Sequence, residues 1–180
     1  VIWTTTTWTL PGNVAIALNP DFSYSLVKAN GEYYVMADGL YQSALEDAGI
    51  KEYRILGSLA GKELEYMLTQ HPFLERTSLV IVGDHVTLES GTGCVHTAPG
   101  HGIEDFDVCK NYPELPVVVP VDNQGHLTAE AGQFEGLSTQ EASKAIAKHL
   151  EETGSLFAMK KIIHQYPHCW RCKKPVIFRA

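Results

Sequence analysis

Turn residues interrupt the chain so often that short elements are expected along most of its length. Glycine, proline and asparagine separate apolar or β-branched runs, a pattern that predicts short strands. The strongest hairpin signal is Asn30-Gly31, because both residues tolerate positive φ between the apolar runs 24–28 and 33–37. Further strands are expected at 2–9, 14–18, 53–56, 79–82, 86–88, 94–97, 116–121 and 156–163.

Helices are expected at three places, and the mix of elements is α+β. Residues 138–153 give the clearest signal, since Ser138 and Glu141 form a capping box, an apolar stripe follows and Gly154 ends the helix. Residues 40–48 predict a second helix ending at a glycine. Residues 103–111 predict a third, with acidic residues in its first turn that favour the helix dipole.

The bulk composition limits the classes of function. A chain of 180 residues fits one domain, and no stretch of about 18 apolar residues is present to span a membrane. The formal net charge of −7 argues against a broad surface that binds nucleic acid through phosphate neutralisation. Four cysteines without a secretory signal favour a reducing, cytoplasmic compartment over a disulfide framework.

The segment 91–106 is the most unusual part of the chain. It carries four glycines, His96, His101 and two adjacent acids in a passage from strand to helix. Glycines let a ligand approach the backbone closely, and a helix start presents free N–H groups. Asp105 would lie in the first helical turn, where a carboxylate can bind an ammonium group. A simple strand–turn–helix corner with an acidic cap would give the same pattern.

Residues 3–9 form a second candidate, a hydroxyl-rich segment flanked by Trp3 and Trp8. Hydroxyls can bind a ribose or a terminal adenosine, and an indole face can stack on a base. The plainer interpretation is an exposed threonine strand whose tryptophans face the core.

The third candidate is the pair Cys169 and Cys172, which is half of a zinc knuckle. Structural zinc requires four ligands, so either the partner ligands lie elsewhere or no metal binds, and no cofactor is expected.

A nucleophilic hydrolase is disfavoured because Cys94 and Cys109 lack a surrounding signature. His85, His96 and His101 could each act as a base, although a structural role is expected for His85. A metal site built from His96, His101 and Asp105 would need a fixed geometry that the intervening glycines and proline make doubtful.

Several motifs occur together in one order, at 3–13, 83–87, 91–106, 166–171 and 175–180. In this combination they resemble the editing domain, connective peptide 1 (CP1), of isoleucyl-tRNA synthetases, over essentially the whole chain. The valyl and leucyl enzymes share the fold but typically continue the threonine-rich segment as Thr-Thr-Arg-Pro. The Trp-Thr-Leu-Pro continuation and the His-Thr-Ala-Pro-Gly-His-Gly segment are more similar to the isoleucyl branch.

This resemblance implies a single editing domain over 1–180, excised from a larger synthetase, with 164–180 returning to the catalytic domain as a β-ribbon. Its core would be a mixed or antiparallel, barrel-like set of short strands with peripheral helices. The implied activity is post-transfer editing, in which a positioned water hydrolyses the ester of valine wrongly attached to isoleucine tRNA. The implied partners are the 3′-terminal adenosine of that tRNA and the rest of the parent synthetase.

The resemblance also assigns roles by position. Asp105 matches the carboxylate that binds the α-ammonium group, and His96 matches the wall that admits valine but excludes isoleucine. Asn13 matches a polar residue near the same pocket. The expected catalytic residues are Asp105, Thr5 and Thr6, and the expected substrate-binding residues are His96, Thr4, Trp8, Asn13, Gly100 and His101.

One position departs from the family pattern, because Thr7 stands where proline is usual. Proline would fix φ and remove an N–H group, so threonine changes both beside the substrate segment. Two alternatives therefore stay open. One is a module that binds the tRNA 3′ end with weakened hydrolysis, and the other is a zinc-binding domain built on Cys169 and Cys172.

Overall fold

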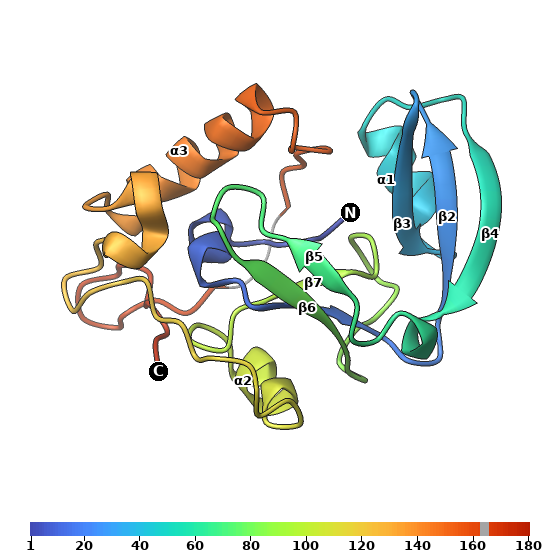
Figure 1. Cartoon of the computed structure of the whole chain (residues 1–180). Coiled ribbons are helices and arrows are strands. Elements are labelled where there is room, and N and C mark those ends of the chain that lie inside the picture. The colour runs from blue at the N-terminus through green and yellow to red at the C-terminus, as the bar shows by residue number, and fades with distance from the viewer. Residues whose placement is uncertain (163–165) are drawn as a thin grey trace.

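The computed structural model describes residues 1–162 and 166–180, and in that part of the chain the strands form two separate sheets (Figure 1). The four-stranded sheet has the order β5-β6-β1-β7, in which β1 runs parallel to β6 and antiparallel to β7. The three-stranded sheet is antiparallel, with the order β3-β2-β4. The strands are β1 (Ala15–Leu18), β2 (Ser23–Ala29), β3 (Glu32–Ala37), β4 (Arg54–Ala60), β5 (Leu68–Gln70), β6 (Thr77–Val82) and β7 (Val95–Thr97).

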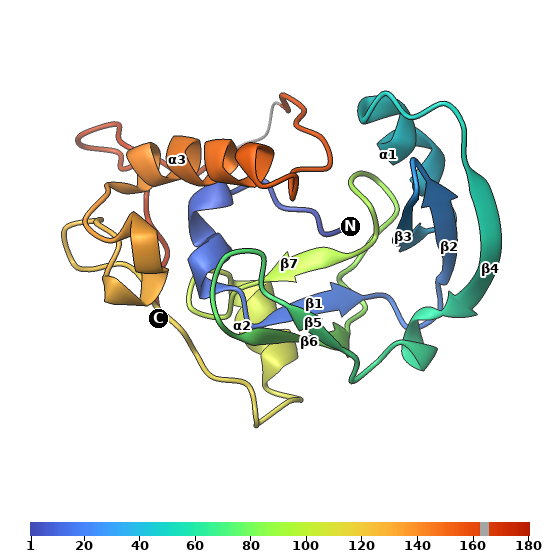
Figure 2. The ribbon, with the colours of Figure 1, turned by 45° about the horizontal axis from the view of Figure 1, so that its top comes forward.

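Six helical segments accompany these sheets in the described residues. The α-helices are α1 (Tyr41–Asp47), α2 (Ile103–Cys109) and α3 (Thr139–Glu152), and the 3₁₀ helices are η1 (Thr7–Gly12), η2 (Gly61–Glu63) and η3 (Ala129–Phe134). Figures 1 and 2 show α3 over η1 on one side of the four-stranded sheet and the three-stranded sheet on the other. None of the described helices is long and apolar enough to cross a membrane.

Local sequence signals account for the best-predicted elements. The β2–β3 hairpin turns at Asn30 and Gly31, whose φ values are 52° and 85°, as its sequence predicts. Helix α3 begins with the expected capping box, in which Ser138 accepts from Glu141 N and Glu141 accepts from Ser138 N. Its apolar stripe packs against η1 and η3 in one core cluster (Trp8, Leu10, Val121, Leu127, Ala131, Phe134, Ala142, Ile146 and Leu150).

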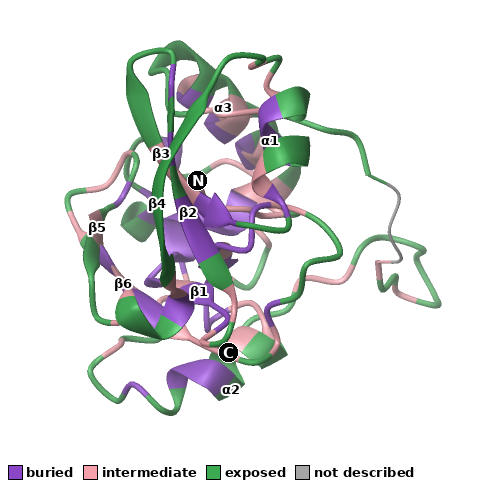
Figure 3. Ribbon diagram, turned by 90° about the vertical axis from the view of Figure 1, so that its right-hand side faces the viewer, coloured by how far each residue is buried: buried purple, intermediate pink, exposed green. Residues whose placement is uncertain are grey.

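The expected α+β class is confirmed, but the described strands do not close into a barrel. Strand β7 is only three residues long and ends one edge of its sheet. The three-stranded sheet keeps its own small core with α1, formed by Val27, Met36, Ala44 and Leu45. Figure 3 shows the outer strand of this sheet, β4, exposed along most of its length.

Several predicted strands are wrong, each for a physical reason. Residues 2–9 bend into η1 because hydroxyls bind nearby backbone: Thr4 Oγ1 accepts from Thr6 N, and Thr9 Oγ1 donates to Thr6 O. Residues 86–88 and 116–121 join no sheet, the second run containing two prolines without N–H donors. Residues 156–162 are irregular, and residue 163 lies outside the described part.

The C-terminal segment was expected to be a β-ribbon over 164–180. Residues 164 and 165 lie outside the described residues, and the described remainder contains one isolated antiparallel bridge, between His168 and Pro175. The segment returns to the main body, where Ala180 N donates to Gly100 O. It therefore lies against the glycine-rich turn that precedes α2.

Candidate functional site

A cavity of about 310 Å³ lies where the threonine-rich segment, β7, the start of α2 and the C-terminal segment meet. Most of the site residues expected from the sequence line it, although they come from two segments about 90 to 100 residues apart. The lining residues are Trp3, Thr4, Thr5, Thr6, Trp8, Thr9, Val95, His96, Ala98, His101, Asp105, Tyr166 and Phe178.

Asp105 supplies the carboxylate of this cavity. It lies in the first turn of α2, and its Oδ2 accepts a hydrogen bond of 2.8 Å from Ala98 N. Its Oδ1 has no hydrogen-bond partner among the described residues. Burial raises the pKa of Asp105 above its ordinary value, while the Ala98 N–H partly opposes that rise. A partly desolvated carboxylate with one unused oxygen is suited to bind an ammonium group.

His96 forms a rigid wall because both of its ring nitrogens are engaged. Asn13 Nδ2 lies 2.7 Å from Nδ1, and Thr9 Oγ1 lies 3.0 Å from Nε2. Burial, together with smaller contributions from the nearby His71 and His101, lowers the pKa of His96 to about 3. The imidazole is therefore neutral at physiological pH and its nitrogens are occupied, so His96 can shape the cavity but is a poor general base.

His101 lines the cavity, but its polar atoms face the protein. Its Nδ1 lies 2.9 Å from Phe178 O, and its ring packs edge-on against Trp8 with 4.9 Å between ring centroids. Its Nε2 is buried without a hydrogen-bond partner in the described structure. A Cβ added at Gly12 would lie 3.2 Å from the ring, which is a tight contact. The histidine therefore ties η1 to the C-terminal segment.

Two of the expected residues do not line the cavity, and a third lines it but is mostly buried. Asn13 does not line the cavity but supports His96 from behind. Gly100 is also absent from the lining, and its missing Cβ makes room for the backbone, since a Cβ there would lie 2.3 Å from Val118 O. Trp8 contributes an edge to the cavity but is only 8% exposed and belongs mainly to the α3 core.

Sequence reasoning missed part of the lining. Thr9 carries the same hydroxyl signal as the threonines before it and could have been included. Trp3 was noted as a stacking residue, and a glycine explains its position, because a Cβ at Gly91 would lie 2.5 Å from its indole ring. Tyr166 and Phe178 come from the C-terminal segment, and no local pattern connects them with residues 3–9.

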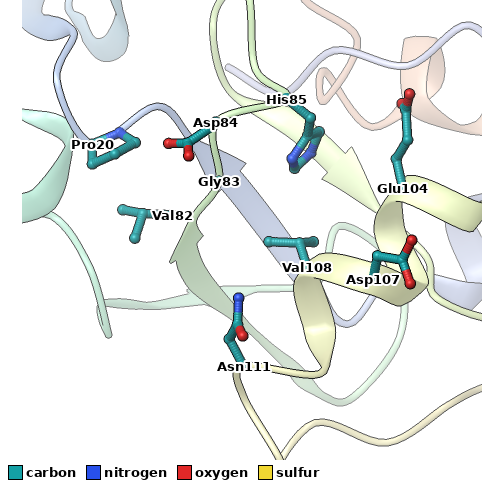
Figure 4. A pocket seen from close by; sticks show the side chains of 9 residues that line it. All are labelled: Pro20, Val82, Gly83, Asp84, His85, Glu104, Asp107, Val108 and Asn111. Carbon is teal, nitrogen blue, oxygen red and sulfur yellow. The ribbon is translucent and has the colours of Figure 1, made fainter.

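A second hollow, of about 360 Å³, lies beside α2 and has a different character (Figure 4). Asp84, Glu104 and Asp107 contribute to it, with His85 on the same rim. Three carboxylates disfavour a phosphate-bearing ligand, and none of the expected site residues lines this hollow. We therefore assign the candidate site to the cavity around Asp105 and His96.

The cysteine pair lies in a turn of the C-terminal segment, away from this cavity. Cys169 N donates to Lys174 O, and backbone N–H groups of Cys172 and Arg171 lower the pKa of the Cys169 thiol. Residues 1–162 and 166–180 contain no group of three or more His, Cys, Asp or Glu side chains that could hold a metal ion. His96, His101 and Asp105 are therefore not grouped in this way among the described residues.

Comparison with solved structures defines the class of fold. The crystal structure of GlLeuRS-CP1 superposes with a TM-score of 0.67 over 91% of this chain and 82% of that chain, at 15% identity. The P. knowlesi cytosolic leucyl-tRNA synthetase editing domain gives a TM-score of 0.64 over 84% of this chain and 80% of that chain, at 10% identity. The chain has the fold of the CP1 editing domains of aminoacyl-tRNA synthetases.

Comparison with curated sequences narrows the class. The chain is 61% identical over all 180 residues to the isoleucine–tRNA ligase of Caldicellulosiruptor bescii, and 54% identical to that of Moorella thermoacetica. It spans about a fifth of the length of these relatives, with 20% and 19% covered. No family model matches. The resemblance to isoleucyl-tRNA synthetases is therefore confirmed over the whole chain.

Proposed function

We propose that this chain hydrolyses the ester bond of valine wrongly attached to the isoleucine tRNA. The observation that carries the proposal is the single cavity shared by the threonine hydroxyls, the His96 wall and the Asp105 carboxylate. An aminoacyl ester needs those three features, namely polar groups for the ribose and ester, a pocket for the side chain and an anion for the ammonium. The matching tRNA ligases supply the biological context.

Such an activity compensates for a limit on binding selectivity. Isoleucine exceeds valine by one methylene, from which a hydrophobic pocket extracts only about 1–3 kcal/mol, and isoleucyl-tRNA synthetase is itself the standard example of this figure. A second site that admits only the smaller side chain multiplies the selectivity. In this proposal the immobile His96 ring provides the steric limit, since hydrogen bonds of 2.7 and 3.0 Å hold both of its nitrogens.

The chemistry that fits the cavity is direct attack of water on the ester carbonyl. His96 is held neutral, and the two nitrogens of His101 are engaged or buried, so neither ring offers a base to the ester. The hydroxyls of Thr5 and Thr6, 3.4 Å apart, can orient the water and the carbonyl. Asp105 fixes the ammonium group, and positioning of this kind contributes several kcal/mol to a rate.

A deacylation assay tests the proposal. Isoleucine tRNA carrying radiolabelled valine is incubated with the 180-residue chain, with the same tRNA carrying isoleucine as the matched control. Accelerated release of valine with isoleucine left attached is the expected result. Binding of the tRNA 3′ end without release of either amino acid would support the binding-module alternative instead.

The partners and compartment follow from the proposed substrate. The chain would contact the terminal adenosine and the misattached amino acid, while the rest of the parent synthetase would hold most of the tRNA. A net charge of −7 agrees with such a division, because this segment offers few cations to the phosphates. Translation places the enzyme in the cytoplasm.

A further inference from the structure

We propose that Ser78 is a positioning residue of this cavity, which acts through Asn13 on the His96 wall. The inference deepens the proposed function, because it concerns how the size limit of the same site is set. Ser78 lies on β6, does not line the cavity and belongs to no motif singled out in the sequence. Its side chain is nevertheless 2% exposed and hydrogen-bonded toward the site.

The hydrogen bonds that hold the His96 ring have fixed donors and acceptors. Asn13 Nδ2 lies 2.9 Å from Ala15 O, and because a carbonyl oxygen can only accept, this contact fixes which end of the amide points that way. The same Nδ2 then donates its second proton to His96 Nδ1 at 2.7 Å. His96 must therefore carry its proton on Nε2, from which it donates to Thr9 Oγ1, and Thr9 in turn donates to Thr6 O at 2.7 Å.

Ser78 forms the hydrogen bond at the opposite end of the Asn13 amide from His96. Its hydroxyl donates to Asn13 Oδ1 at 2.5 Å, and no other donor reaches that oxygen among the described residues. Asn13 is itself only 3% exposed, so water cannot readily replace the serine. The hydroxyl thus fixes the plane of the amide that holds the imidazole.

The backbone around Ser78 is well suited to hold this position. Strand β6 pairs with β1 on one side and with β5 on the other, and Ser78 is opposite Thr69. Thr69 Oγ1 also donates to Ser78 O at 3.0 Å. The sheet therefore holds one end of a hydrogen-bonded series that reaches the threonine-rich segment. The series consists of four side chains, Ser78, Asn13, His96 and Thr9.

Removal of the serine hydroxyl should loosen the wall without removing any group that touches the substrate. Asn13 Oδ1 would be left buried and unpaired, and the amide and imidazole would relax to find other partners. We expect the ratio of valine to isoleucine release to fall by about tenfold, which corresponds to one buried hydrogen bond. Valine release itself should change little, since Asp105 and the threonines are untouched.

The test compares Ser78→Ala with Ser78→Thr, which retains the hydroxyl, and with Ser143→Ala as a matched control. Ser143 donates one bond of 3.0 Å to Thr139 O on α3, away from the cavity. If Ser78→Ala does not fold, Ser78→Cys carries the same comparison, because its thiol fills similar space but donates weakly. Each variant is assayed for release of valine and of isoleucine, and the imidazole ¹⁵N shifts of His96 are recorded.

Two results are expected for Ser78→Ala (or Ser78→Cys) alone: a lower selectivity ratio and His96 ¹⁵N shifts displaced from the fixed Nε2–H pattern. Selectivity and shifts equal to those of the Ser143→Ala control would overturn the proposal. The ¹⁵N measurement does not depend on catalysis. If the unmodified chain releases neither amino acid, the proposed function fails, while the shifts still decide whether Ser78 positions His96.

Discussion

Replacing Asp105 by asparagine would remove one charge from the cavity and keep the shape of the side chain. The asparagine Oδ1 can accept the Ala98 N–H that Asp105 accepts at 2.8 Å, so the start of α2 is expected to be preserved. Burial raises the pKa of Asp105, which means that the ionised carboxylate is less favourable in the folded chain than in the unfolded chain. The variant should therefore be at least as stable as the parent at neutral pH.

The loss of activity can be estimated from the interaction that is lost. A hydrogen bond to a charged partner contributes about 1.5–3 kcal/mol, and asparagine would present a neutral amide to the substrate ammonium. That range corresponds to a loss of roughly 10- to 150-fold in kcat/KM for valine release. The carboxylate is half-buried, so solvent screening should keep the effect within this range instead of the larger value for a fully buried pair.

The assay is single-turnover deacylation of the valyl ester across a range of pH, with thermal unfolding of the same samples. In the parent chain the activity should fall on the acid side as Asp105 is protonated, at a pH above the ordinary carboxyl range because its pKa is raised. The Asp105→Asn variant should lack this acid limb. A folded variant with activity within about twofold of the parent would refute the assigned role, since a contributing charge is worth more than that.

Three further predictions follow from the same geometry. His96→Ala should raise isoleucine release by at least about tenfold, the selectivity typical of one methylene, and unchanged sparing of isoleucine would place the size limit elsewhere. Burial is the main cause that lowers the pKa of His96 to about 3 and that of His71 to about 4. The stability that depends on their neutral forms is therefore complete above pH 6.5, the ordinary pKa of histidine, and is lost as the pH falls toward the two lowered pKa values. Urea unfolding should then give a free energy about 2–4 kcal/mol lower at pH 5 than at pH 7, and a flat profile would contradict the burial argument. Thr7→Pro should stabilise the chain by about 0.4–1 kcal/mol with unchanged valine release, because Thr7 begins η1 and the preceding Thr6, at φ −134° and ψ 85°, is outside the α region that a following proline disfavours. A loss of stability would show that the Thr7 N–H matters.

The elements that could be predicted from the sequence are those whose cap, turn or apolar pattern lies within the element itself. Helix α3 has a cap and an apolar stripe, and the β2–β3 turn needs positive φ at Asn30 and Gly31. The runs 86–88 and 116–121 are apolar enough for strands, but a strand also requires a partner edge. Whether an edge is available depends on the tertiary arrangement, which no local pattern contains.

Some residues of the candidate site also carry a local sequence signal, whereas others depend on contacts between distant segments. Asp105 and His96 lie in one unusual segment, and their placement on one cavity agrees with the residue types and the glycines around them. Ser78 could not be found, because its role depends on a hydrogen bond to Asn13, 65 residues away, across the parallel pairing of β1 and β6. The threonine-rich segment was identified as important but assigned the wrong backbone, since its hydroxyls bind their own main chain.

A crystal structure of this chain with a non-hydrolysable valyl-adenosine analogue would show directly whether Asp105 and His96 bind one substrate. We expect its ammonium group at the unused Oδ1 of Asp105, its isopropyl group against the His96 ring and its ribose beside Thr4–Thr6. Binding of the analogue in the acidic hollow beside α2, or with its side chain directed away from His96, would contradict a size filter built on that histidine.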